Sequence, residues 1–138
     1  MRLPPVTIRH SAPATQHSRS ERPKDTLGRV GEAMALRHLR DDGFTILDRN
    51  WRCAMGEIDI VARDGDTLVI CEVKTRSSLR YGTPLEAITE TKLHRLERLA
   101  ASWMRERGVR ANRVRIDAIC VHRPPRGQIS IEHIRDLT

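Results

Sequence analysis

The chain has 138 residues, a length typical of one domain, and carries a formal net charge of +7 at pH 7. Five basic residues and one acidic residue fall within residues 1–24, so the rest of the chain is only mildly basic and must concentrate charge locally to hold a polyanion. No apolar segment approaches the length of a membrane span, and the first residues lack the apolar stretch of a secretory signal.

The beginning of the chain differs in composition from the rest. Four of the seven prolines lie in residues 1–24, among Ser, Thr, Gln, His and Arg. A segment of this kind buries little apolar surface, so we expect a disordered basic leader over 1–24 and a single folded domain over 25–138. A dispensable tail is a simpler interpretation of this leader than a nucleic-acid-binding arm.

The three cysteines, Cys53, Cys71 and Cys120, form no CxxC pair, which argues against a structural zinc site. Cys71 and Cys120 stand in apolar strand-like runs and are expected to be small buried hydrophobic residues. Scattered thiols of this kind favour a reducing compartment, so we expect a cytoplasmic protein.

The domain is predicted to begin with a helix over 25–42 that ends at Gly43. A short strand over 44–47 should follow, and then an irregular link over 50–56.

Two further strands are predicted over 57–63 and 66–75. The Asp64-Gly65 pair between them is a strong signal for a hairpin turn. The first three strands can therefore form a meander.

A second helix is predicted from the capping box Thr83-Pro84-Leu85-Glu86 to Gly108. Strands over 114–120 and 128–134 follow, separated by the turn at Pro124-Pro125. The helix is long enough to cross over, so the next strand should be parallel to its neighbour. The sequence therefore predicts an α/β domain with a mixed sheet, in the order α-β-β-β-α-β-β.

Charged residues on two of these strands are predicted to share one face. Residues two apart on a strand point to the same side, so Glu72 and Lys74 project together, as do Glu57 and Asp59. If the two strands pair, three carboxylates and one ammonium group crowd a single patch of sheet. Carboxylates at this range repel one another, and a divalent cation would neutralise them.

Asp59 and Glu72 are the candidate ligands for Mg²⁺ or Mn²⁺, and the Val73 carbonyl is a candidate third oxygen. Such an ion would polarise a phosphodiester and lower the pKa of an attacking water, while Lys74 would orient that water or stabilise the phosphorane charge. Glu-x-Lys alone is more often an ion pair on a sheet face. The Asp on the adjacent strand makes a catalytic site the favoured interpretation.

Glu32 and Glu57 are weaker candidates for the same site. Glu32 lies on the apolar face of the first helix, where a cation and a neighbouring arginine are equally consistent partners for it. Glu57 lies on the same face of its strand as Asp59, but a strand-end glutamate bound by an arginine is the more common arrangement.

Basic residues near these acids are candidates for contacts with phosphate groups. Arg76 follows the strand lysine, Arg80 lies in the next loop, and Lys92 lies on the second helix. For Arg95 and Arg98 on the same helix, a solvated face is slightly preferred. The four histidines beyond the leader show no ligand spacing, and no catalytic triad can be assembled.

Taken together, the motifs resemble those of the YraN family, a set of small bacterial proteins, over residues 26–121. This family is similar to the PD-(D/E)xK nuclease superfamily, close to archaeal Holliday-junction resolvases. The segments that carry the resemblance are Gly31-Glu32, Arg49-Asn50-Trp51-Arg52, Gly56-Glu57-Ile58-Asp59, Glu72-Val73-Lys74-Thr75-Arg76, Gly82-Thr83-Pro84-Leu85-Glu86-Ala87 and Lys92.

The resemblance implies a restriction-endonuclease-like three-layer core, a Mg²⁺-dependent nuclease site and, by analogy with the resolvases, a homodimer. It places the metal-binding carboxylates on Asp59 and Glu72, the lysine on Lys74 and the first-helix acid on Glu32. Ile58 stands where the motif has its naming proline, a position at which many members vary.

The sequence therefore predicts a metal-dependent endonuclease that hydrolyses phosphodiester bonds of DNA, with branched or structured DNA as the expected substrate. A non-catalytic nucleic-acid-binding or assembly module that retains the fold is the alternative, because a shared fold does not fix function. A phosphodiesterase acting on RNA or small nucleotides is a weaker interpretation.

Overall fold

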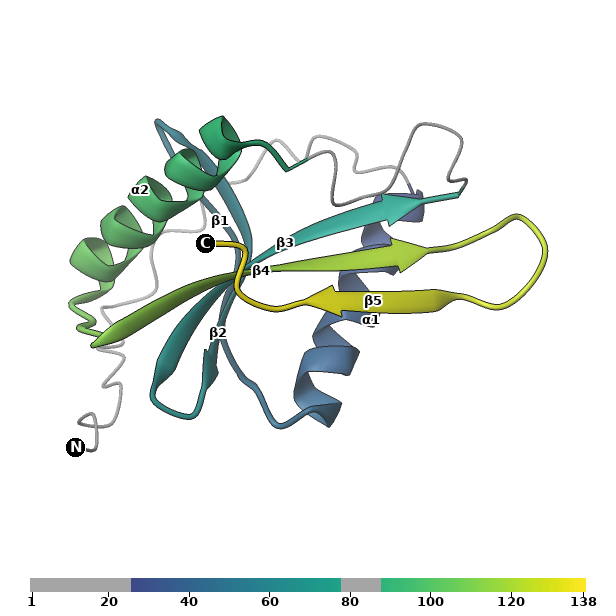
Figure 1. Cartoon of the computed structure of the whole chain (residues 1–138), viewed down its shortest axis with the longest axis horizontal. Helices are drawn as coiled ribbons and strands as arrows, with labels where there is room; N and C mark the ends of the chain where they lie inside the picture. Colours follow the sequence, from purple (N-terminus) through teal and green to yellow (C-terminus); the bar gives the residue numbers. More distant parts are fainter. Residues whose placement is uncertain (1–25, 78–87) are drawn as a thin grey trace.

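The computed structural model describes residues 26–77 and 88–138, so the expected leader lies outside it. Within these residues the elements follow the predicted order, and five strands form one sheet in the order β1-β2-β3-β4-β5 (Figure 1). The elements are α1 (Thr26–Asp41), β1 (Thr45–Cys53), β2 (Gly56–Asp64), β3 (Thr67–Arg76), α2 (Glu90–Arg107), β4 (Arg113–His122) and β5 (Ser130–Ile134).

The directions of the strands confirm the predicted mixed sheet. β1, β2 and β3 form an antiparallel meander, β4 runs parallel to β3, and β5 returns antiparallel to β4. The turn between β2 and β3 consists of Gly65 and Asp66, and Gly65 supplies a positive φ of 58° that suits a two-residue hairpin loop.

The two helices pack on opposite faces of the sheet, which gives the α/β layers seen in Figure 1. The face that α1 covers includes Val69 and Cys71 of β3, whereas the face that α2 covers includes Leu68 and Ile70. This alternation follows from the two-residue period of a strand. The helical residues buried in these two interfaces are Ala35, Leu36 and Leu39 of α1 and Leu96, Leu99, Ala100 and Trp103 of α2.

Both helices end at the glycines that the sequence indicated. Gly43 has a φ of +87°, and the N–H of Phe44 donates to the Leu39 carbonyl at 2.9 Å, which closes the end of α1. Gly108 adopts the left-handed conformation at the end of α2. None of the helices among the described residues is both long and apolar enough to cross a bilayer.

The prediction of a short strand over 44–47 with an irregular link over 50–56 was wrong. β1 continues to Cys53, and its pairing with β2 reaches Cys53 and Gly56. β1 lies at the edge of the sheet, where polar residues can face solvent and obscure the strand pattern. Its irregularity is confined to a register shift between Ile46 and Asp48 and to a positive φ at Asn50.

The predicted start of the second helix was also wrong. Ile88 and Thr89 are not helical, and Thr89 caps α2 by accepting a hydrogen bond at Oγ1 from the Lys92 N–H at 3.2 Å. The capping box expected at 83–86 lies outside the described residues. The helix that faces the sheet is therefore shorter than expected.

Candidate functional site

The site lies where β2 and β3 separate. Their paired register runs from Asp64 and Thr67 to Ile60 and Cys71, and stops there although both strands continue. Asp59 is the next residue on β2. β3 meanwhile remains paired with β4 as far as Arg76, so the opening forms on the β2 side of β3 alone.

Asp59 spans this opening. Its Oδ2 accepts a hydrogen bond from the backbone N–H of Val73 at 2.9 Å. The Val73 side chain packs with the core on the α1 face, so its neighbours Glu72 and Lys74 project toward the α2 face. The sequence suggested the Val73 carbonyl as a metal ligand. In the structure, the Val73 N–H holds the Asp59 carboxylate in position.

A hollow of about 190 Å³ opens beside Asp59 on the α2 side of the sheet. The strands contribute Asp59 and Glu72 to its lining, so both predicted metal ligands face one space. The other residues that line the hollow are Gly56 and Glu57 of β2, Ile88 before α2, and Lys92, Arg95 and Leu96 of α2.

Lys74 is joined to one of these acids. Its Nζ lies 3.1 Å from Glu72 Oε1, and the two side chains are only 23% and 17% exposed, respectively. Such partial burial strengthens the attraction relative to a fully exposed pair. The structure thus joins Lys74 to Glu72 and lines one hollow with Asp59 and Glu72, the three residues that the sequence argument singled out on these strands.

Lys92 extends the group from the helix side. Burial and the neighbouring Lys74 ammonium group lower the pKa of Lys92, and Glu72 opposes this effect only in part. Two ammonium groups therefore lie close together beside two carboxylates. An anionic group such as a phosphate would relieve the repulsion between the two lysines.

The other predicted phosphate contacts have different outcomes. Arg76 is the last residue of β3, two residues beyond Lys74 and paired with His122 of β4, and its contact with phosphate stays a prediction. Arg80 lies outside the described residues. Arg95 is exposed, as the preferred solvated face predicts, and it also lines the hollow.

Glu57 and Glu32 lie at the margins of this arrangement. Glu57 lines the hollow and forms an ion pair with Arg52 at 3.2 Å, as expected for a strand-end glutamate. Glu32 is half-buried on α1, which covers the opposite face of the sheet. Among the described residues, the carboxylates of Glu32, Asp59 and Glu72 do not gather within 4.8 Å of one another, so the place of Glu32 in the acidic cluster stays a prediction.

The backbone of α1 nevertheless lies against β3 at Thr75, the residue that follows Lys74. A Cβ atom added at Gly31 would overlap the Thr75 side chain, including its Oγ1 and its Cβ at 2.9 Å. Glycine is therefore required for the helix to approach the strand this closely. This contact determines how closely α1 lies to β3 beside the charged residues.

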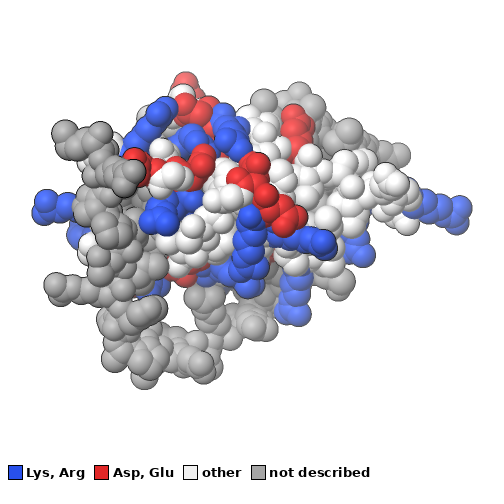
Figure 2. Space-filling model, turned by 90° about the horizontal axis from the view of Figure 1, so that it is seen from below, with Lys and Arg blue, Asp and Glu red and all other residues white. Residues whose placement is uncertain are grey.

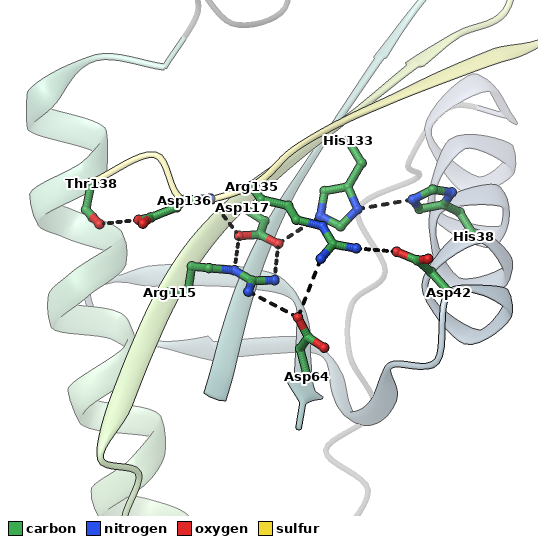
Figure 3. A network of polar contacts seen from close by, with 9 residues as sticks. All are labelled: His38, Asp42, Asp64, Arg115, Asp117, His133, Arg135, Asp136 and Thr138. Carbon is green, nitrogen blue, oxygen red and sulfur yellow. Dashed lines mark hydrogen bonds and ion pairs between the residues drawn. The ribbon is translucent and has the colours of Figure 1, made fainter. Parts of the chain in front are cut away.

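A buried polar network on the α1 face was missed by the sequence argument (Figure 3). Asp117 is fully buried and accepts hydrogen bonds from Arg115 Nε at 2.8 Å and from the Asp136 N–H at 3.0 Å, and its Oδ2 lies 2.8 Å from His133 Nε2. Burial alone would raise the pKa of Asp117, but these partners hold it at about 2. The available signal was an Asp inside the apolar run of β4.

A second polar network joins β1 to α2. Asp48 Oδ2 accepts hydrogen bonds from Trp103 Nε1 at 2.9 Å and from Arg107 Nη2 at 2.8 Å. Trp51 Nε1 donates to Glu106 Oε2 at 2.9 Å. These contacts connect the edge strand to the helix that forms one wall of the hollow.

The charges of the described residues on one face of the molecule are mixed in sign. On the face drawn in Figure 2, Lys and Arg side chains of the described residues are interleaved with Asp and Glu. A nucleic acid on this face would therefore meet local groups of positive charge rather than a broad basic surface.

The fold and the site together define an α/β protein in which acids and lysines cluster where two strands of a mixed sheet separate. Residues 31–121 match the family described as "Uncharacterised protein family UPF0102". The chain belongs to this family, which is the YraN group expected from its motifs.

Similar proteins carry the same family name. The chain is 55% identical over 114 residues to a UPF0102 protein of Nocardioides sp., covering 83% of this chain and 92% of the relative. It is 54% identical over 118 residues to one of Kineococcus radiotolerans, covering 85% and 97%, respectively. It is 53% identical over 114 residues to one of Frankia casuarinae, covering 83% and 97%.

Proposed function

We propose that this protein is a metal-dependent endonuclease that hydrolyses phosphodiester bonds of DNA, with branched or structured DNA as its substrate. One observation carries the proposal: Asp59 and Glu72, from two adjacent strands, line one hollow, and Lys74 contacts Glu72 at 3.1 Å. The resemblance of the motifs to the PD-(D/E)xK nucleases supports the proposal further, because it implies metal-binding acids at Asp59 and Glu72 and a catalytic lysine at Lys74.

The donor set of the hollow fits Mg²⁺ or Mn²⁺. Asp59 and Glu72 offer carboxylate oxygens, which these ions prefer, and the hollow leaves room for water and for a phosphate group. When bound, such an ion would supply Lewis-acid chemistry at the scissile phosphate. The Val73 N–H would hold Asp59 in place for this role, because it already binds one carboxylate oxygen.

The lysines would act on the substrate directly. In the hydrolysis, the oxygen of a water forms a bond to phosphorus, the bond from phosphorus to the sugar oxygen breaks, and the leaving oxygen ends protonated. Lys74 would orient the water or donate hydrogen bonds to the phosphate oxygens as negative charge develops on them. Lys92 and Arg95 would hold a phosphate at the mouth of the hollow.

The test uses the purified chain with end-labelled four-way junction, flap and linear duplex DNA, each with Mg²⁺, with Mn²⁺ and with chelator. We expect products with either metal, most with the branched substrates, and none with chelator. The Lys74→Ala variant should still bind DNA but should cut at least about a hundredfold more slowly. An Arg98→Ala variant, on an exposed part of α2, is the matched control and should cut normally.

Two results would contradict the proposal. Binding without product under every metal condition would favour the non-catalytic module instead. Unchanged metal-dependent cutting by Lys74→Ala would remove this lysine from the mechanism. The same assays with labelled RNA show whether the substrate is DNA or RNA.

A further inference from the structure

A second group of potential metal ligands lies on the other side of the sheet. His38, Asp42 and His133 place one ligand atom each within 4.8 Å of one another. His38 is in the last turn of α1, Asp42 follows that helix directly, and His133 lies on β5, as Figure 3 shows. We propose that these three residues form a binding site for a transition-metal ion of the Zn²⁺ class, separate from the hollow beside Asp59.

The contacts of His133 orient its imidazole to bind a metal ion. Its Nε2 lies 2.8 Å from Asp117 Oδ2, and its side chain is only 7% exposed. A carboxylate accepts hydrogen bonds, so this contact is made when His133 Nε2 carries the proton and donates it. That tautomer has a lone pair at Nδ1. A histidine whose other nitrogen donates to a carboxylate is the usual arrangement in metal sites.

The two imidazoles already have nearly the spacing that one ion requires. His38 Nε2 and His133 Nδ1 are 3.1 Å apart. Two nitrogens bound tetrahedrally at about 2.05 Å to one Zn²⁺ would be about 3.3 Å apart. A small shift would therefore admit the ion, and without it the same spacing allows one N–H···N hydrogen bond.

Asp42 supplies the third ligand and a path to solvent. Its side chain is 45% exposed, so water can complete the coordination shell. Arg135 forms an ion pair with Asp42 Oδ2 and also lies 3.8 Å from Asp64 Oδ2. Because a carboxylate has two oxygens, one can stay with Arg135 while the other binds the ion.

The chemistry of the ligand set selects the kind of ion. Two neutral imidazoles and one carboxylate suit Zn²⁺, Cu²⁺ or Ni²⁺, whereas Mg²⁺ and Ca²⁺ prefer oxygen ligands throughout. Three protein ligands with water in the fourth position also match an open zinc site rather than a closed structural one. The proposed site is thus chemically distinct from the carboxylate hollow on the α2 face.

The test is a Zn²⁺ titration of the full chain against a chromogenic chelator. The parent protein carries His10→Ala and His17→Ala, which removes the two leader histidines as competing ligands. We expect one Zn²⁺ per chain, with affinity at least tenfold weaker in His38→Ala and in Asp42→Asn. His94→Ala, at an exposed position of α2, should bind as the parent does.

A direct readout of the ligand atoms accompanies the titration. In protein labelled with ¹⁵N at histidine, Zn²⁺ should shift the resonances of His38 Nε2 and His133 Nδ1 and leave His94 unchanged. Absence of Zn²⁺ binding by the parent would overturn the proposal. So would binding of equal affinity in His38→Ala, because it would place the ion elsewhere.

Discussion

The Asp59 carboxylate and the Val73 backbone are joined by a 2.9 Å hydrogen bond across the opening between β2 and β3. On β2 this bond lies one residue beyond Ile60, and on β3 two residues beyond Cys71, the last paired residues of the two strands. The neighbouring strand therefore positions the acid through its main chain, and a side chain change at Val73 would leave the contact in place.

The first prediction concerns this contact. Asp59→Ala removes the acceptor of the Val73 N–H, whereas Asp59→Asn keeps a side-chain oxygen that can accept. We expect Asp59→Ala to lower the free energy of unfolding by about 1 kcal/mol more than Asp59→Asn does, as measured by urea denaturation. Equal stability of the two variants would show that the bond contributes nothing to the fold.

The second prediction concerns the contact of α1 with β3. In an open helical position, Gly→Ala stabilises a protein by up to about 1 kcal/mol. At Gly31 a methyl group would overlap Thr75, so Gly31→Ala should destabilise by about 1–3 kcal/mol instead. The sign of the change in unfolding free energy decides between these outcomes. A Gly31→Ala/Thr75→Ala double variant should recover part of the loss, because it removes the Oγ1 and the methyl group that the new Cβ would meet.

Local sequence patterns predicted much of the fold and the core of the candidate site. Strand parity placed Glu72 and Lys74 on one side of β3, and the glycines marked the ends of both helices, because both signals depend on neighbouring residues. The start of α2 was predicted less well, because the sequence argument began this helix at the box over 83–86, whereas Thr89 is the N-cap of α2.

What the sequence could not predict depends on long-range packing. His38 and His133 meet although they are 95 residues apart, because α1 crosses the face of the sheet on which β5 places His133. Neither residue stands in a local motif. The extension of β1 depends in the same way on its pairing with β2, since its own sequence alternates too weakly to define a strand.

The third prediction concerns pH. The pKa of Asp117 is held at about 2 against an ordinary value of 3.8, so its ionised form is stabilised in the folded protein. This contribution, about 2 kcal/mol, is present above pH 3.8 and is lost as the pH falls toward 2. Asp117→Asn should reduce stability at neutral pH and flatten its dependence on pH in this acid range.

Urea denaturation at a series of pH values measures this effect. Asp66→Asn, at an exposed turn position, serves as the control and should follow the wild-type curve. An Asp117→Asn variant that loses stability in acid as steeply as the wild type would show that other carboxylates govern acid unfolding.

The fourth prediction concerns the link from β1 to α2. Asp48→Ala leaves Trp103 Nε1 and the Arg107 guanidinium without their shared acceptor. Because Trp103 is buried, we expect a loss of about 2–3 kcal/mol in the free energy of unfolding. Tryptophan fluorescence during denaturation follows this change. Asp48→Asn, which retains an acceptor oxygen, should lose less, and equal losses would contradict the assigned role.

The most direct test of the central claim is the binding of Mn²⁺, measured by electron paramagnetic resonance with wild type, Asp59→Asn, Glu72→Gln and the control Asp66→Asn. If Asp59 and Glu72 together hold a divalent cation in the hollow, the first two variants should lose at least tenfold in affinity for one Mn²⁺ while the control binds as wild type does. Equal Mn²⁺ binding by all four proteins would contradict the claim.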